Sequence, residues 1–114
     1  MLVVTRAIPD FLRAPLEAFA ARLRATFGDR LRELRLFGSY ARGEAVEDSD
    51  IDVLVLVDGL TEREWRVVFD DLTPVLLETG LPIAPLAMST QHLEDLRKAE
   101  RLLARDLDQE GIPL

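Results

Sequence analysis

A seven-residue apolar run, Ile51–Val57, constrains the fold of this chain more than any other segment. Asp52 is its only polar residue, and four of the seven residues are isoleucine or valine. A run this short and this rich in β-branched side chains is typical of a strand buried on both faces. The sequence therefore predicts a fully buried strand that carries one carboxylate near its start.

The residues before this strand predict a helix, a second strand and a loop. Apolar residues at helical spacing predict a helix that stops at Gly28, with Pro15 tolerated only in its first turn. Leu31–Phe37 alternates imperfectly between leucine and charged residues and is expected to be a strand. Gly38–Asp50 is polar and contains glycine, so we expect a loop with room for one helical turn.

The residues after the buried strand predict a helix and an edge strand. Thr61 and Glu64 form a capping-box pattern at the start of the helix, Pro74 should kink or shorten it, and Gly80 should end it. Leu81–Met88 is apolar but contains two prolines, which a central strand does not tolerate. We therefore expect this segment at the edge of the sheet.

A last helix and a short strand complete the predicted order of elements. Ser89 or Thr90 is expected to cap the helix, and the tail Gly111–Leu114 to add the strand. The apolar positions of this helix are Leu93, Leu96, Leu103 and Leu107. Short strands that alternate with helices predict an α/β (α+β) fold, with a small sheet and one domain over residues 1–114.

Composition excludes several classes of function. The 114 residues contain no cysteine, which excludes disulfides, thiolate zinc sites and a cysteine nucleophile. No apolar run approaches the roughly 20 residues that cross a bilayer, so we expect a cytoplasmic protein with no membrane partner. The net charge of −7 argues against binding a long nucleic acid, but not against a nucleotide held through a cation.

Asp50 and Asp52 are the strongest candidates for a metal site. Residues two apart on a strand point to the same face, so the two carboxylates are expected to lie side by side. Their repulsion and the burial of Asp52 would both be relieved by a divalent cation, and oxygen ligands select Mg²⁺ or Mn²⁺. Taken alone, such a pair is more often part of a solvated loop.

Four residues before this pair form a candidate phosphate-binding segment. Gly38 lets backbone approach a ligand, and Ser39 offers a hydroxyl and an N–H group to a phosphate oxygen. Arg42 could reach a phosphate, and Ser49 could orient Asp50. The plain alternatives are a Gly-Ser turn and a surface ion pair of Arg42. The combination in this order beside a metal pair favours phosphoryl or nucleotidyl transfer.

The segment Phe37–Val57 resembles the signature of the minimal nucleotidyltransferase (MNT) family of the DNA polymerase β-like superfamily. The matching residues are Gly38, Ser39, Arg42, Gly43, Ser49, Asp50 and Asp52. The resemblance implies a mixed sheet flanked by helices. It also implies an enzyme that transfers a nucleoside monophosphate, normally AMP from ATP, to an acceptor hydroxyl, with two Mg²⁺ ions held by three carboxylates. Such proteins often act as antitoxins of a HEPN-domain toxin, and some adenylylate that toxin.

One departure from the family pattern leaves two functions open. The family's third carboxylate lies on a later strand, but Leu81–Met88 contains no acid, and Ala84 or Pro82 stands where an aspartate is expected. Glu78 and Glu94 flank the segment and could substitute in space. The first hypothesis is an active nucleotidyltransferase; the alternative is a weakened or inactive domain that neutralises its partner by contact.

Three further residues have two interpretations each. Tyr40 could touch the nucleotide or anchor the loop, and Trp65 could pack in the core or mark a partner or homo-oligomer surface. His92 is expected to be a surface or capping residue rather than an acid–base group.

Overall fold

The computed structural model describes residues 8–45, 49–100 and 111–113. The elements follow in the predicted order. They are α1 (Asp10–Phe27), the 3₁₀ turn η1 (Gly28–Arg30), β1 (Leu31–Phe37), α2 (Ser39–Arg42), β2 (Ile51–Val57), α3 (Glu62–Thr79), β3 (Ile83–Ser89), α4 (Thr90–Ala99) and β4 (Ile112–Pro113).

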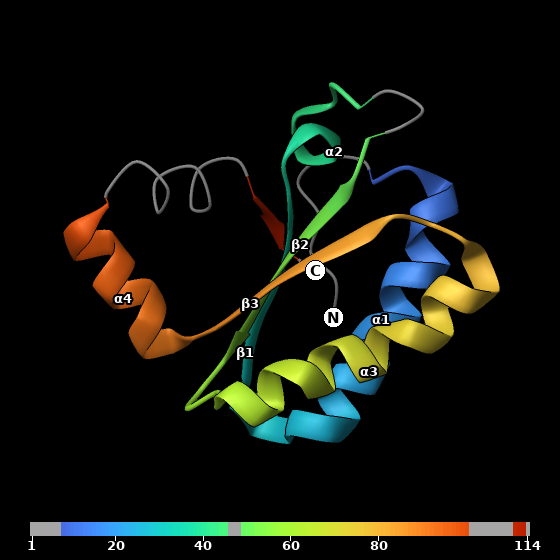
Figure 1. Cartoon of the computed structure of the whole chain (residues 1–114). Helices are drawn as coiled ribbons and strands as arrows, with labels where there is room; N and C mark the ends of the chain where they lie inside the picture. Colours follow the sequence, from blue (N-terminus) through green and yellow to red (C-terminus); the bar gives the residue numbers. More distant parts are fainter. Residues whose placement is uncertain (1–7, 46–48, 101–110, 114) are drawn as a thin grey trace.

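The strands form one mixed sheet in the order β3-β2-β1-β4 (Figure 1). β1 runs antiparallel to both of its neighbours, β2 and β4, whereas β2 and β3 are parallel. A parallel pair needs a crossover connection, which α3 supplies between β2 and β3. The predicted α/β (α+β) class with a small mixed sheet is confirmed.

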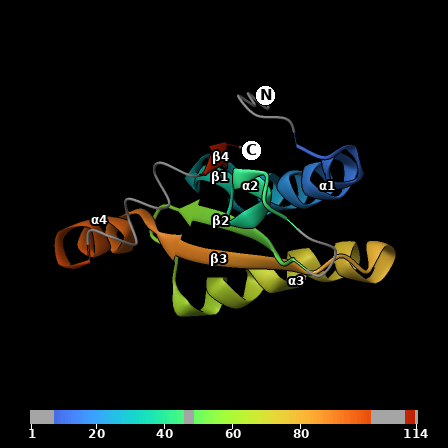
Figure 2. The same ribbon diagram turned by 90° about the horizontal axis from the view of Figure 1, so that it is seen from above.

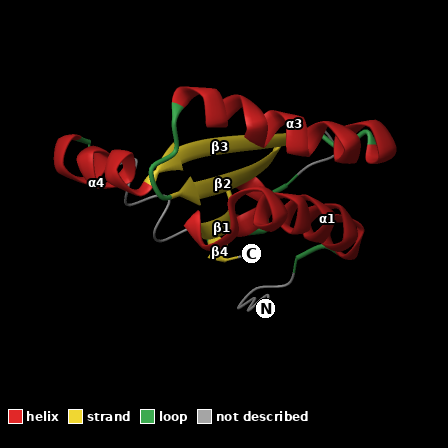
Figure 3. Cartoon of the chain, turned by 90° about the horizontal axis from the view of Figure 1, so that it is seen from below, coloured by secondary structure: helices red, strands yellow, loops and turns green. Residues whose placement is uncertain are grey.

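The two faces of the sheet belong to different apolar clusters. Alternate residues of β2, such as Val53 and Val55, join the buried residues of α1 and α3 in the larger cluster. Leu54 and Leu56 point the other way and pack with Met88 and with Leu93 of α4. Figure 1 shows α1 and α3 together on one side of the sheet, and Figures 1, 2 and 3 all show α4 on the opposite side of the molecule from α1. Both faces of β2 are therefore buried, as its composition predicts.

Helix α1 contradicts the prediction that Pro15 fits only a first turn. The helix begins at Asp10, so Pro15 lies inside it. A proline there removes the N–H that would bond to the carbonyl group of Phe11. Phe11 is 55% exposed, so this side of the helix faces solvent, where water can satisfy the free carbonyl.

Pro74 does not shorten α3, which was one of its two predicted effects. The helix continues to Thr79, and the carbonyl group that Pro74 leaves without a donor belongs to the exposed residue Asp70. Gly80 ends the helix as predicted, with φ +66°, and its N–H donates to the Leu76 carbonyl at 2.8 Å.

The C-terminal elements agree with the prediction as far as the structure describes them. The Ser89 side chain caps α4 by accepting a hydrogen bond from the His92 N–H at 3.0 Å. The leucines at 103 and 107 lie outside the described residues. Ile112 pairs with Leu36, which confirms a strand in the tail. None of the described helices combines the length and apolarity that a bilayer span requires.

Strand β3 occupies the edge of the sheet, as its prolines predict. The Ile51 N–H donates to the Pro82 carbonyl at 2.9 Å, which sets the direction of the backbone groups that follow. The backbone N–H and C=O groups of successive strand residues point alternately to the two neighbouring sides. The backbone groups of Ala84 therefore face β2, and those of Pro85 face the outer edge. The missing N–H of Pro85 therefore costs the sheet no hydrogen bond.

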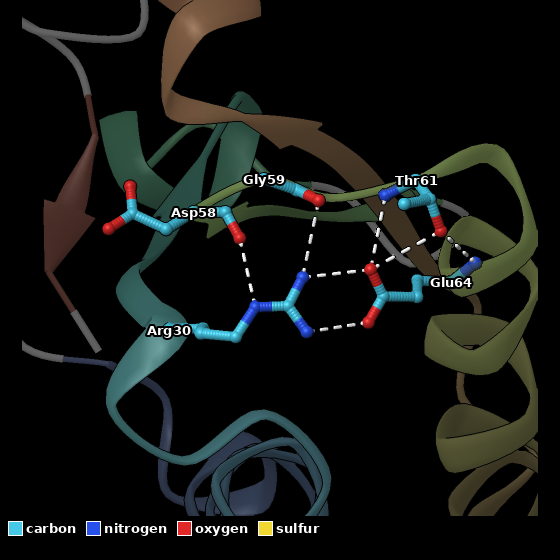
Figure 4. Close-up of polar contacts among 5 residues, drawn as sticks. All are labelled: Arg30, Asp58, Gly59, Thr61 and Glu64. Carbon is cyan, nitrogen blue, oxygen red and sulfur yellow. Dashed lines mark hydrogen bonds and ion pairs between the residues drawn. The ribbon is translucent and has the colours of Figure 1, made fainter.

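A hydrogen-bond network centred on Arg30 joins the end of β2 to the start of α3 (Figure 4). Arg30 donates to both oxygens of Glu64, at 2.6 and 2.8 Å, and to the carbonyl groups of Asp58 and Gly59. Glu64 also completes the predicted capping box, because Thr61 and Glu64 each bond the other's backbone N–H. The network joins η1, the end of β2 and the start of α3.

Asp58 extends this network to β1 and α4. Its carboxylate accepts hydrogen bonds from Arg32 and from the hydroxyl of Thr90, both at 2.6 Å. These bonds hold the pKa of Asp58 below its ordinary value, with the Thr90 hydroxyl as the largest cause.

The Arg30–Glu64 pair predicts a stability change in acid. Hydrogen bonding to Arg30 lowers the pKa of Glu64 from 4.5 to about 2. Because the folded-state pKa is depressed, the contribution of the pair is complete above pH 4.5 and is lost as the pH falls toward 2. In urea unfolding between pH 7 and 2.5, Glu64→Gln should therefore lose less stability than wild type. Glu62→Gln, on the same turn but outside the network, should follow wild type.

Candidate metal and nucleotide site

The sheet register brings three chain segments together at one end of the sheet. Antiparallel pairing aligns Phe37, the last residue of β1, with Asp52 on β2. Parallel pairing aligns Asp52 with Ala84 on β3. The glycine turn after β1 and the starts of β2 and β3 therefore meet around Asp52, at the end of the sheet where α2 lies (Figure 1).

Gly38 and Asp52 approach so closely that only glycine fits. A Cβ atom placed on Gly38 would lie 2.3 Å from Oδ2 and 3.2 Å from Cγ of Asp52. Gly38 also has φ +75° and ψ −152°, a conformation that is essentially restricted to glycine. The Asp52 carboxylate thus lies directly against the backbone of the turn that contains the predicted phosphate-binding residues.

The predicted single helical turn after Gly38 is present as α2. The Arg42 N–H donates to the Gly38 carbonyl at 3.1 Å, and the Glu44 N–H to the Ser39 carbonyl at 2.9 Å. Gly43 ends the turn with φ +73° and ψ +20°. Ser39 therefore occupies the first position of a helical turn directly beside the Asp52 carboxylate.

Arg42 and Tyr40 are held by neighbours within this segment. Arg42 Nε lies 3.1 Å from Oε2 of Glu44, so the ion pair given as the plain alternative for Arg42 is present. The Tyr40 ring packs edge-on against Phe11, with 6.2 Å between ring centroids, and contacts the larger core cluster. The structure thus favours the role of Tyr40 as a loop anchor.

The negative charge of Asp50 acts on the Asp52 carboxylate. The pKa of Asp52 is raised, first by partial burial and second by the negative charge of Asp50, while the charge of Arg42 lowers it. Asp50 is exposed, and Ser49 before it is partly buried. By strand alternation, the Asp52 side chain lies on the same sheet face as Leu54, opposite the α1–α3 layer.

These donors suit one divalent cation rather than two. Two carboxylates beside an open glycine turn offer hard oxygen ligands and leave positions for phosphate oxygens and water, as Mg²⁺ prefers. The position next to Asp52 on β3 is Ala84, so the register selects Ala84 over Pro82 as the residue that replaces an acid. Within residues 8–45, 49–100 and 111–113, no three acidic or histidine side chains gather into a metal cluster.

The two acids that flank β3 do not fill this gap. Glu94 lies on α4, beyond the far end of β3, and pairs with Arg97 at 3.2 Å. Glu78 lies on the last turn of α3, at the Asp52 end of the sheet, but its side chain is exposed and joins no such cluster.

Comparison with known proteins shows the family of this chain. The pattern of the family described as "Nucleotidyltransferase domain" matches residues 16–110. The chain belongs to this family. It is 33% identical to a solved candidate minimal nucleotidyltransferase, with a TM-score of 0.63 over 96% of this chain and 99% of that one. The minimal nucleotidyltransferase resemblance is therefore confirmed.

Two further relatives extend the comparison. The candidate protein adenylyltransferase MJ1305 of Methanocaldococcus jannaschii is 37% identical over 68% of this nucleotidyltransferase chain, which spans only 55% of that relative. A chain of a toxin–antitoxin crystal structure with AMP-PNP shares the fold, with a TM-score of 0.56 and 22% identity over 85% of this chain and 70% of that one.

The Gly38–Asp52 approach predicts unequal effects of two glycine substitutions. Gly38→Ala should cost about 3 kcal/mol or more and displace Asp52, because it combines a glycine-only conformation with a clash. Gly43→Ala is the matched control, since it has a similar φ but no atom within 4 Å of the added Cβ, and should cost about 1 kcal/mol. Urea unfolding measures both; equal costs would contradict the close approach.

The carboxylate pair predicts how the Asp52 titration responds to its neighbours. Without added cation, Asp50→Asn should lower the pKa of Asp52, because it removes a repelling charge, and Arg42→Gln should raise it. Burial should keep the pKa of Asp52 above its ordinary value even in Asp50→Asn. The side-chain carboxyl ¹³C signal of Asp52, followed by NMR against pH, reports all three values.

Proposed function

We propose that this domain transfers AMP from ATP to a hydroxyl group of a protein partner, in a reaction that depends on Mg²⁺. The observation that supports this best is the contact between the Gly38 turn and the Asp52 carboxylate. That contact places a candidate phosphate-binding backbone beside a candidate cation ligand, which is what transfer from a nucleoside triphosphate requires.

The residues divide between binding the cation and binding the triphosphate. Asp50 and Asp52 hold Mg²⁺, with Mn²⁺ as a substitute, and are the catalytic residues. Gly38 and Ser39 bind phosphate oxygens through backbone N–H groups and the Ser39 hydroxyl. Arg42 adds positive charge beside the triphosphate. Ser49 is a further member of the nucleotide-binding segment and orients Asp50.

The proposed reaction exchanges one bond at the α-phosphorus for another. The acceptor hydroxyl oxygen attacks the α-phosphorus of ATP, and the bond from that phosphorus to the oxygen leading to the β-phosphate breaks. Pyrophosphate leaves with the electron pair of that bond, and the hydroxyl proton is released to water. Asp50 and Asp52 would hold the cation, which would supply positive charge to the phosphate oxygens as negative charge develops on them.

We propose a toxin of the HEPN type as the acceptor, with this chain as its antitoxin. Support comes from the protein adenylyltransferase relative and from the toxin–antitoxin structure with AMP-PNP. Trp65 is 47% exposed and its ring packs at a tilt of 56° against that of Phe69, with 4.7 Å between ring centroids, so it lies at the surface rather than in the core. A partly exposed aromatic pair of this kind is suited to contact with another protein.

A second candidate function is neutralisation of the partner by contact alone. It is favoured by Ala84, which brings no oxygen to the position beside Asp52. In this case, nucleotide and cation would stabilise the binding-competent domain without transfer. The two candidates differ in whether a variant without cation binding still neutralises the partner.

Asp52→Asn separates these functions. Loss of cation binding removes several kcal/mol of transition-state stabilisation, so transfer of label from α-labelled ATP to lysate proteins should fall by at least about 100-fold. Asp70 is an exposed acid on α3, and the control variant Asp70→Asn should transfer label to lysate proteins as wild type does. If Asp52→Asn still protects cells from the co-expressed toxin as well as wild type does, protection comes from contact and the adenylylation proposal for the antitoxin fails.

A further inference from the structure

We propose that the site binds one divalent cation per nucleotide and that the side chain at position 84 limits the rate of transfer. The inference rests on the proposed function and concerns the part of the site that Asp50 and Asp52 do not supply. It assigns a rate-limiting role to the Ala84 side chain, so that a carboxylate added at this position should raise the rate of transfer.

The register of the β2–β3 pairing fixes Ala84 beside Asp52. The hydrogen bond of 2.9 Å from the Ile51 N–H to the Pro82 carbonyl fixes the first step of the parallel pairing. Asp52 then aligns with Ala84, and the pairs Leu54–Leu86 and Leu56–Met88 continue the same register. Aligned residues of parallel strands share a sheet face at the interstrand spacing of about 4.8 Å, so the Ala84 methyl points to the Asp52 side.

The apolar cluster on this face shows that the register is held by packing as well. Leu54, Leu56 and Met88 are buried together on the side of the sheet to which Asp52 points. A slip of one residue would turn the β3 side chains to the other face and remove Met88 from this cluster. Position 84 is therefore a fixed neighbour of the carboxylate, and its side chain is only partly buried.

The Ala84 methyl group can neither bind a second cation nor accept a proton from the acceptor hydroxyl. A second cation about 4 Å from the first needs carboxylate oxygens on its own side, and alanine offers none. The acceptor hydroxyl also needs a base for its proton, and no further acid joins Asp50 and Asp52 in the described parts of the chain. In the proposed wild-type reaction that proton passes to water, whereas a positioned carboxylate base speeds such steps by about 10²–10⁴-fold.

Ala84→Asp tests the proposal, with Ala84→Asn as a matched control of the same shape but no charge. We expect Ala84→Asp to raise the rate of AMP transfer to the acceptor by at least about 100-fold and Ala84→Asn to leave it near wild type. Equilibrium dialysis with Mn²⁺ and a non-hydrolysable ATP analogue supplies a measurement besides activity. The ratio of bound Mn²⁺ to bound nucleotide should be one in wild type and Ala84→Asn, and two in Ala84→Asp.

Each other outcome overturns the proposal. A ratio of two in wild type, which needs no variant to fold, would refute the single-cation site and leave the proposed function standing. A folded Ala84→Asp with a ratio of one and no gain in rate would refute the role of position 84. Wild type that retains neither nucleotide nor Mn²⁺ would overturn both this inference and the proposed function.

Discussion

The pairing of β1 on β2 is the constraint on which the rest of this molecule depends. It aligns Phe37 with Asp52, and so the backbone of the next residue, Gly38, lies against the Asp52 carboxylate. Only glycine fits at position 38, because both the backbone conformation and the close approach of Asp52 exclude a side chain. The same strand, β2, carries the core on both of its faces. One strand therefore couples the folding of the domain to the assembly of its candidate site.

Much of the fold follows from sequence because its strongest signals are local. The apolar run Ile51–Val57 predicts a buried strand, and Thr61 with Glu64 predicts a helix start, since each pattern reflects contacts within a few residues. Pro15 and Pro74 mislead for the same reason. A proline removes one hydrogen bond, but whether that ends a helix depends on solvent access to the freed carbonyl, and tertiary packing decides this access.

The candidate site is predictable in its residue types but not in its neighbours. Asp50 and Asp52 stand out because acids beside an apolar run need a chemical reason. The choice of Ala84 over Pro82 required the register of a parallel pair, which the chain sets across a helix of 18 residues. The bonds of Arg30 to Glu64 join residues 34 positions apart. No local pattern distinguishes Arg30 from the other arginines, so only the folded chain shows this network.

The outward-facing nitrogen of Pro85 limits how copies of this domain can associate. A strand that paired with the β3 edge would find no N–H donor at Pro85, so the new strand pair would lack one hydrogen bond. The β3 edge is thus less suited to growth of the sheet from chain to chain, a common route to aggregation. A partner that approaches from this side also meets Trp65, an exposed side chain of the neighbouring helix α3.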